Sequence, residues 1–210
     1  MKIIRVVRKD EKNVAIYFDN DQKLILSEDI FFSSGLRKDD EVPDDRYNFF
    51  IEQNILFHIK QRALSFLTRR FHSEKELFIK LKSKAYDEIL IKKILNELKI
   101  HSFIDDRNFA FHFADEKFSR KKWGTNKIRS ALFSKGVSGS IIDEVLSSIK
   151  VSENNDVLME LAQKKFQKLK LREKDSRKIS QKIISFLLSR GFDYESSADI
   201  VRKIIKQDFD

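Results

Sequence analysis

The chain is 210 residues long, 41% hydrophobic and 36% charged, and its five glycines and one proline favour long helices with few turns. Its formal net charge of +9 is uneven, because residues 1–58 carry 9 basic and 12 acidic side chains while residues 59–210 carry 33 and 21. The absence of cysteine excludes disulfides and thiolate sites, and no apolar run is long enough for a signal peptide or a membrane span, so we expect a cytoplasmic protein.

The first 30 residues predict a small antiparallel β-meander. Three runs rich in β-branched and aromatic residues are separated by turn-like segments; the runs are 2–8, 14–18 and 23–26. Either Ser27 or Asp29 can cap a short helix that Gly35 ends. Residues 39–45 are expected to form a linker or an acidic helix start. A sheet this small is stable only if it packs on the helices that follow.

From about Asp45 the hydrophobic period is helical, and an internal repeat appears. Three short turns align on a central residue, position zero, which is Ala85, Gly136 or Gly191. Five positions around each turn are aliphatic in all three copies. They are Leu77, Leu81, Ile94, Leu95 and Leu98; Ile128, Leu132, Val145, Leu146 and Ile149; and Ile183, Leu187, Ile200, Val201 and Ile204.

The turns predict the same local structure in each copy. Glycine at position zero fits the left-handed residue that ends many helices, and the apolar residue after it can complete a Schellman closure. Asp87, Ser138 and Asp193, two residues later, are good N-caps for the next helix. Ala85 is the misfit, because a Cβ atom disfavours the left-handed region, and the first turn is open to a different conformation.

A further helix precedes each pair, so the sequence predicts three tandem three-helix units. Their first helices contain residues 62–67, 109–114 and 157–162, with Asp105 as N-cap of the second and a capping box of Ser73 and Glu76 in unit one. We expect a mainly α fold of stacked repeats in an elongated, curved array behind the β-rich head. The expected domains are the head at 1–44 and repeats at 45–104, 105–152 and 153–210.

No catalytic constellation is apparent. Asp105 and Asp106 are neighbours, but adjacent residues on a helix point about 100° apart, and N-capping explains them better than a catalytic dyad. The four histidines are isolated and are expected at surface or semi-buried positions; they are His58, His72, His101 and His112. A phosphate-binding glycine loop is also missing, so we expect no enzyme, no metal and no cofactor.

Basic clusters near the ends of the first helices are the stronger signal. They recur at equivalent places, so in a stacked array they would form a stripe for an anionic partner. The candidates are Arg69 and Arg70; Lys117, Arg120, Lys121 and Lys122, extended by Lys127 and Arg129; and Lys164, Lys165, Lys168 and Lys170. Two simpler explanations stay open: stabilisation of the helix dipole, and a lysine-rich genome.

The aromatic residues favour packing over base stacking. Phe66, Phe109 and Phe113 sit at helical core intervals, and Trp123 next to a glycine is more typical of a packing residue.

Several motifs resemble the RecX family of recombination regulators. The resemblance is carried by Ala63-x-x-Phe66-Leu67, Ser73-Glu74-Lys75-Glu76-Leu77, Phe103-Ile104-Asp105-Asp106 and Gly124-x-x-Lys127-Ile128, followed by Lys135-Gly136-Val137. It spans most of the chain and is strongest over residues 60–150, while Ala85 and Phe103 depart from the family's usual glycine and tyrosine.

The resemblance implies a partner, the RecA recombinase filament on single-stranded DNA, whose strand-exchange, ATPase and co-protease activities such a regulator restrains in DNA repair and the SOS response. We expect a monomer that reaches this DNA directly or within the filament, with no membrane partner. A free-standing nucleic-acid-binding protein is the main alternative, and it would bind bare DNA as tightly as the filament. A scaffold for unrelated partners, or an enzyme that needs Asp105 and Asp106, is a more distant possibility.

Overall fold

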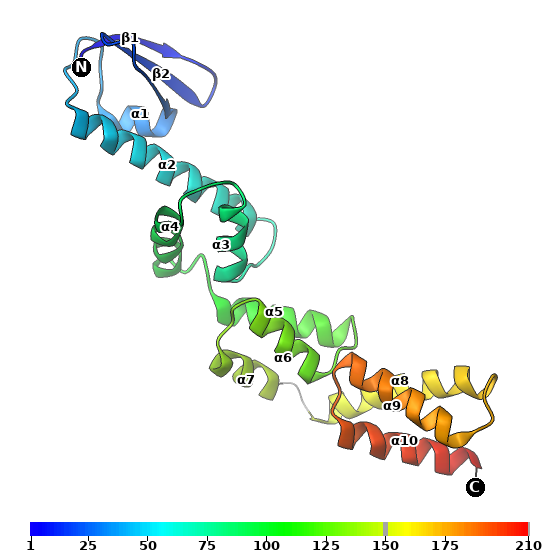
Figure 1. Ribbon diagram of the computed structural model, residues 1–210. Coiled ribbons are helices and arrows are strands. Elements are labelled where there is room, and N and C mark those ends of the chain that lie inside the picture. The colour runs from blue at the N-terminus through cyan, green and yellow to red at the C-terminus, as the bar shows by residue number, and fades with distance from the viewer. Residues whose placement is uncertain (149–150, 210) are drawn as a thin grey trace. The chain divides into compact units, whose positions relative to one another are not determined.

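The computed structural model describes residues 1–148 and 151–209 (Figure 1). Ile149, one of the fifteen predicted aliphatic positions, lies outside the described residues. Within them the fold is mainly α with a small N-terminal antiparallel sheet, as predicted. The strands are β1 (Ile3–Arg8), β2 (Asn13–Phe18) and β3 (Lys23–Ser27), and the first two helices are α1 (Glu28–Ser34) and α2 (Asp44–Leu67).

Eight further helices follow among the described residues, and together with α2 they correspond to the nine helices of the predicted repeats. They are α3 (Glu74–Lys82), α4 (Glu88–Ile100), α5 (Asp106–Ser119), α6 (Thr125–Ser134), α7 (Gly139–Ser147), α8 (Val151–Lys170), α9 (Ser176–Arg190) and α10 (Tyr194–Phe209). The chain divides into two compact units. The first contains Met1–Arg70 with Leu77–Phe103, and the second contains Phe71–Glu76 with Ile104–Asp210. The predicted head and repeat boundaries stay a prediction.

The β-meander of the first unit is stabilised by α2, as a sheet of this size requires. The strands pair in the order β1-β2-β3 and share a core in which Phe50 of α2 packs with Phe18 and Leu26. Asn54 of α2 also satisfies the edge strand β3, because its Oδ1 accepts the Ser27 N–H at 2.8 Å and its Nδ2 donates to the Ile25 carbonyl at 3.1 Å. One helix therefore covers both the face and the open edge of the sheet.

The short helix α1 begins and ends where the sequence indicates. Ser27, rather than Asp29, occupies the N-cap position with extended backbone, but its hydroxyl makes no capping hydrogen bond. Gly35 ends the helix with a left-handed φ of 68°. The acidic residues Asp44 and Asp45 form the first turn of α2, so the segment proposed as linker or helix start is in part a helix start.

The repeat positions form the cores of the helical units. All fourteen predicted aliphatic positions that the structure describes are buried. In the second unit they belong to one continuous core that runs from Phe109 of α5 to Ile204 of α10. The hydrophobic spacing around the turns therefore predicted the buried face of each helix correctly.

The three turns share one left-handed residue. Gly136 has φ 84° and Gly191 has φ 94°, and both turns are Schellman closures, since the N–H of Val137 bonds to the Leu132 carbonyl and that of Phe192 to the Leu187 carbonyl. Ala85 adopts the same conformation, with φ 61°, in spite of its Cβ atom. The first turn thus has the same left-handed residue, an unfavourable alanine, and the Ala85 N–H bonds to the Lys82 carbonyl, but the described residues show no closing bond from the Tyr86 N–H to the Leu81 carbonyl.

Replacing Ala85 with glycine is expected to stabilise the chain by about 1 kcal/mol, because it removes the left-handed strain of an L-residue. Part of that gain is offset by the greater freedom of glycine in the unfolded state. The measurement is the urea midpoint of the helical circular dichroism signal. A lower midpoint for Ala85→Gly would contradict the assigned strain.

The N-caps that follow the turns are confirmed in position and in bonding for Asp87 and Asp193, and in position alone for Ser138. Asp87 accepts the Ile89 and Leu90 N–H groups, and Asp193 accepts the Ser196 N–H at 2.8 Å. Burial alone would raise the pKa of the Asp193 carboxyl, but hydrogen bonds from Ser196 and from the backbone of Asp193 and Glu195 together outweigh burial and lower this pKa. Ser138 occupies the N-cap position of α7, yet its hydroxyl lies 3.2 Å from that of Ser140 and makes no capping bond.

Candidate binding surface

Within the second unit, the end of α9 is joined to the start of α6. The Gly124 N–H donates to the Arg190 carbonyl at 2.9 Å, and the Asn126 N–H donates to the Gly191 carbonyl at 3.0 Å. Helix starts have N–H groups, and helix ends have carbonyl groups, that lack a partner in their own helix. The two helix ends therefore satisfy each other, and the third turn is fixed against α6.

An equivalent joint connects the second turn to the start of α3. The Ser73 hydroxyl donates to the Lys135 carbonyl at 2.7 Å and accepts the Glu76 N–H at 3.2 Å, which confirms the serine half of the predicted capping box. Lys135 forms an ion pair with Glu76, and Gly136 lies against Lys75. The residue before position zero is basic in each turn, and in these two turns it contacts the preceding repeat.

The joint at α6 brings two of the predicted basic clusters together. The Arg190 guanidinium donates to the Lys121 carbonyl at 3.2 Å and lies 5.4 Å from the centroid of the Phe186 ring. The Lys165 ammonium lies 5.3 Å from the same ring. A lysine after α5, the end of α9 and a lysine of α8 are thus linked through Arg190 and Phe186.

The charges of the same two clusters also act on one carboxylate. The hydrogen bond and charge of Lys164, with a contribution from the charge of Lys122, hold the pKa of the Glu160 carboxyl below its ordinary value. Lys122 therefore acts on the same carboxylate as the α8 lysine. We call the α5–α9 basic cluster the five cations that these interactions link, together with Arg120, which precedes Lys121 in the chain; its members are Arg120, Lys121, Lys122, Lys164, Lys165 and Arg190.

Several predicted cations interact with other residues of the chain. Lys127 donates to the Ser189 carbonyl at 3.1 Å and lies 4.9 Å from the Trp123 ring, while Lys117 bonds to Glu116 and contacts the same indole. Trp123 is partly buried against the core of the second unit, which is the packing role expected of it. The predicted cations Arg129, Lys164 and Lys170 pair with acidic side chains, respectively Asp143, Glu160 and Asp208.

Other predicted cations make no ion pair with any residue that the structure describes. They are Arg69, Arg120, Lys121, Lys122, Lys165 and Lys168, and all but two are exposed; Lys122 and Lys165 are half-buried. Arg120, Lys121 and Lys122 stand together where α5 ends, so their charge is available to a partner. Arg69 and Arg70 belong to the first unit, and Arg70 has interactions of its own.

Arg190 was missed by the sequence prediction. It precedes the third turn, at the position that Lys84 and Lys135 occupy in the other turns. That recurrence was visible in the aligned turns. Its role between two clusters depends on interactions between residues almost 70 positions apart, which a linear pattern does not indicate.

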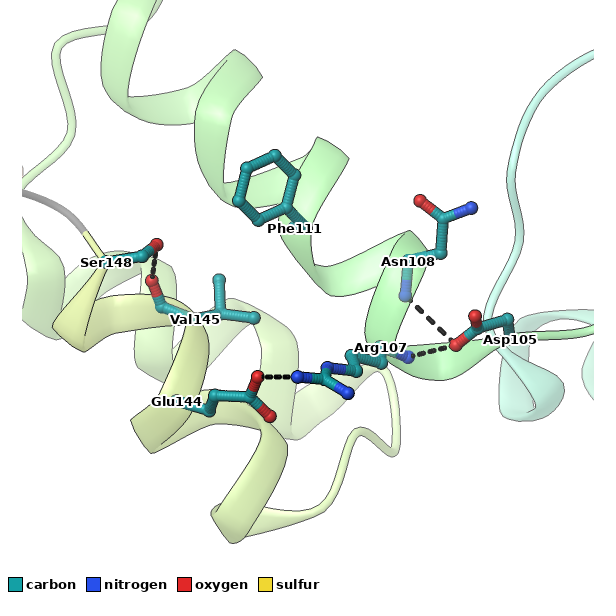
Figure 2. Close-up of a pocket in the computed structure, with 7 residues that line it drawn as sticks. All are labelled: Asp105, Arg107, Asn108, Phe111, Glu144, Val145 and Ser148. Carbon is teal, nitrogen blue, oxygen red and sulfur yellow. Dashed lines mark hydrogen bonds and ion pairs between the residues drawn. The ribbon is translucent and has the colours of Figure 1, made fainter.

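The acidic pair is used for helix capping, as predicted, and Figure 2 shows Asp105 at the start of α5. Its Oδ1 accepts the N–H groups of Arg107 at 2.8 Å and Asn108 at 3.0 Å. Asp106 instead accepts the Glu74 N–H at 2.9 Å, and so caps the start of α3. The two carboxylates cap different helices and do not converge as a catalytic dyad.

The hollow beside Asp105 has a volume of about 380 Å³ and is crossed by an ion pair between Arg107 and Glu144 (Figure 2). Exposed Phe111 and the edge of Val145 complete it. Across the described residues, no three histidine or acidic side chains are grouped so that they could hold a metal ion.

The histidine and phenylalanine side chains follow their predictions only in part. His72 is only 3% exposed, so the prediction of surface or semi-buried histidines is wrong for this residue, which lies at the packed start of α3. The core prediction for the phenylalanines holds for Phe109, while Phe113 packs partly buried against the same core and Phe66 is half-buried.

No helix in the described part of the chain combines the length and the apolar composition needed to cross a bilayer.

Comparisons with family models and with known proteins all identify the same family. Models of the first, second and third three-helix domains of RecX match residues 60–98, 105–146 and 152–201. The regulatory protein RecX of Clostridium botulinum (strain Eklund 17B) is 33% identical over 202 residues, which cover 96% of this chain and 94% of that relative. The regulatory protein RecX of Clostridium acetobutylicum is 32% identical over 206 residues, or 97% and 95% of the two chains.

Two crystal structures have the same fold. One of a regulatory protein RecX superposes with a TM-score of 0.76 at 23% identity, covering 99% of both chains. One of RecX from Lactobacillus salivarius superposes with a TM-score of 0.65 at 24% identity, covering 72% of this chain and 97% of the other.

Proposed function

The chain belongs to the RecX family of regulatory proteins, and from that premise we propose that it binds the RecA recombinase filament on single-stranded DNA and restrains strand exchange, ATP hydrolysis and co-protease activity. The proposal includes the head at 1–44, the three repeats at 45–104, 105–152 and 153–210, a monomeric state and a cytoplasmic location. The basic side chains named from the sequence are its proposed contact residues, with Arg190 added.

The α5–α9 basic cluster is the observation that supports this proposal most directly. Residues 59–210 carry twelve more basic than acidic side chains, and several of them stand without an ion pair to any described residue where α5 ends. A surface of this kind attracts the phosphates of nucleic acid and releases their counterions. Since Arg190 and Phe186 link cations from two repeats, the cluster offers a partner several charges at once.

Helix-dipole stabilisation alone does not explain the cluster. Cations at a helix end contribute about 0.3–1 kcal/mol each and act within the last turn. Lys121 and Lys122 lie beyond the end of α5 at Ser119, and the latter acts on Glu160 of another helix. This position favours a role in binding.

A gel-shift experiment with and without recombinase tests the proposal. We expect the protein to shift recombinase-coated single-stranded DNA at concentrations that leave bare DNA unbound, and to lower the rate of ATP hydrolysis. Equal affinity for bare DNA, falling steeply with salt, would indicate the alternative of a free-standing nucleic-acid-binding protein. Retention of neither DNA nor recombinase would support a scaffold for other partners.

A further inference from the structure

The first unit contains a hollow of about 420 Å³ whose lining differs in charge from the basic repeats. The turn between β1 and β2, the start of α1 and one face of α2 enclose it. Its lining residues are Glu11, Lys12, Asn13, Ser27, Glu28, Asp29, Phe57, His58 and Gln61. The lining therefore contains three carboxylates and one ammonium group.

One carboxylate of the hollow already binds a guanidinium. Arg8 Nη2 lies 3.1 Å from Oε1 and 3.3 Å from Oε2 of Glu28. The other two carboxylates, those of Glu11 and Asp29, make no ion pair with any described residue. The hollow thus has hydrogen-bond acceptors for a second cation. The neighbouring pair of Arg8 and Glu28 shows how a guanidinium binds to a carboxylate here.

A buried hydroxyl in the same lining also lacks a partner. Ser27 is 2% exposed, and its Oγ makes no hydrogen bond within the described residues. It occupies the N-cap position of α1 without capping that helix. A buried polar group without a hydrogen bond is unfavourable, so this hydroxyl is better satisfied when a hydrogen-bonding group enters the hollow.

The acidic lining does not suit a metal ion. Glu11 and Asp29 come from different segments, and the described chain contains no grouping of three metal-ligating side chains. Nucleic acid is also disfavoured, because its phosphates would meet unpaired carboxylates. An organic cation with several N–H donors fits better, because it can reach separated acceptors.

We propose that this hollow binds an arginine side chain of a partner protein. A guanidinium carries five N–H donors in one plane, enough for a carboxylate and a neutral acceptor together, and its flat face can stack on aromatic rings. Glu11 and Asp29 supply the carboxylates, and the rings of Phe57 and His58 supply flat faces in the lining. The head then recognises a basic protein group, while the repeats recognise phosphate.

The test is a titration of the ¹⁵N-labelled full-length chain with N-acetyl-arginine amide, followed by amide chemical shifts. The probe is expected to cause saturable shifts at residues 11–13, 27–29 and 57–61. N-acetyl-citrulline amide, which has nearly the same shape without the charge, is expected to cause none of these saturable shifts. Equal responses to both probes, or no saturable response to the arginine probe, would overturn the proposal.

Matched variants connect the response to the hollow. Glu11→Gln with Asp29→Asn should weaken arginine binding by on the order of tenfold or more, because both charge-assisted acceptors are removed. Glu41→Gln with Asp21→Asn makes the same charge change at exposed acids outside the hollow and should leave the affinity unchanged. Equal weakening in the two double variants would point to net charge alone and contradict the site.

Two further arms complete the experiment. Ser27→Ala should weaken arginine binding severalfold without lowering the urea midpoint, since it removes a buried hydroxyl that has no hydrogen-bond partner among the described residues. An affinity equal to that of the unmodified chain would contradict the proposal. Site-specific shifts caused by magnesium chloride alone would identify a metal site and reject the arginine assignment.

Discussion

Replacing Gly191 with alanine is expected to destabilise the second unit by about 3 kcal/mol, through two separate effects. The first is conformational, because φ at this residue is 94°, where an L-residue costs about 1–2 kcal/mol. The second is steric, since the new Cβ would lie 2.3 Å from Lys127 Cβ and 2.5 Å from the Lys127 backbone nitrogen. The backbone nitrogen cannot rotate away as a side-chain end can, so the joint between α9 and α6 must open.

Other glycines of the chain separate the two effects. Gly35→Ala has the left-handed φ of 68° but open space around its Cβ, so it should cost only about 1 kcal/mol. Gly124→Ala has ordinary backbone but a Cβ 2.4 Å from the Gly191 carbonyl carbon, so it should cost about 2 kcal/mol. Gly139→Ala has neither constraint, and its effect should be close to zero or slightly stabilising.

The single tryptophan makes the measurement local to the joint. Trp123 precedes Gly124 and packs on the core of the second unit, so its fluorescence during urea unfolding follows that unit. Circular dichroism follows Gly35→Ala, which lies in the other unit. A destabilisation by Gly191→Ala no larger than that by Gly35→Ala would show that the close approach to Lys127 carries no energetic weight.

The same geometry gives a reason for the exception in the first turn. In turns two and three, position zero lies against the preceding repeat, at Lys75 and Lys127, and only glycine leaves room there. Ala85 is solvent-exposed and is the earliest turn of the series, with no repeat before it. It experiences the conformational constraint without the steric one, and alanine is therefore less costly here than it would be at Gly191.

The fold was predictable to the extent that its signals are local. The helical period around each turn predicted the buried positions, and residues such as Gly136 predicted the helix ends, because a Schellman closure involves only neighbours in sequence. The N-cap role of Asp105 follows from the same kind of signal. Ser138 shows the limit, since a side chain of the right type found a different partner in Ser140.

The arrangement of the basic side chains was not predictable in the same way. Lys127 and Lys117 look identical in sequence to Lys121, yet both contact the Trp123 ring, and Lys127 also bonds to the Ser189 carbonyl at the joint. Asp106 resembles a second cap for α5, but it caps α3 by accepting the N–H of Glu74, which lies 32 residues earlier in the chain. Such roles depend on which repeat surfaces meet, and a pattern within one repeat does not contain that information.

Reversing the charges of Arg120, Lys121 and Lys122 to glutamate is expected to weaken binding to recombinase-coated single-stranded DNA by on the order of 100-fold. The estimate takes about 1 kcal/mol for each cation replaced, which is less than the roughly 1.5–3 kcal/mol of a hydrogen bond to a charged group because these side chains are largely solvated. The slope of log affinity against log salt concentration should also fall, by roughly 0.7 for each phosphate of a single strand that the variant no longer neutralises. Filament binding and the rate of ATP hydrolysis at several salt concentrations provide both numbers.

A matched control separates position from net charge. Lys9, Arg37 and Lys38 are exposed residues of the head without ion pairs to described residues, so reversing them changes the total charge equally. This head variant should keep its affinity for the filament if the cluster is the contact surface. Thermal unfolding of both variants is needed because Arg120, the C-cap residue of α5, also stabilises the dipole of that helix, by about 0.3–1 kcal/mol.

The two explanations of the cluster then give different results. If its cations only stabilise the helix end, the Arg120, Lys121 and Lys122 variant will melt at a lower temperature but inhibit ATP hydrolysis as well as the unmodified chain does at temperatures where both are folded. If they bind the filament, inhibition will disappear while the variant is still folded. Because Lys122 has φ 54°, glutamate there carries the same backbone strain as lysine, and weaker binding cannot be attributed to that turn. Unchanged inhibition by the folded variant would remove the cluster from the binding surface.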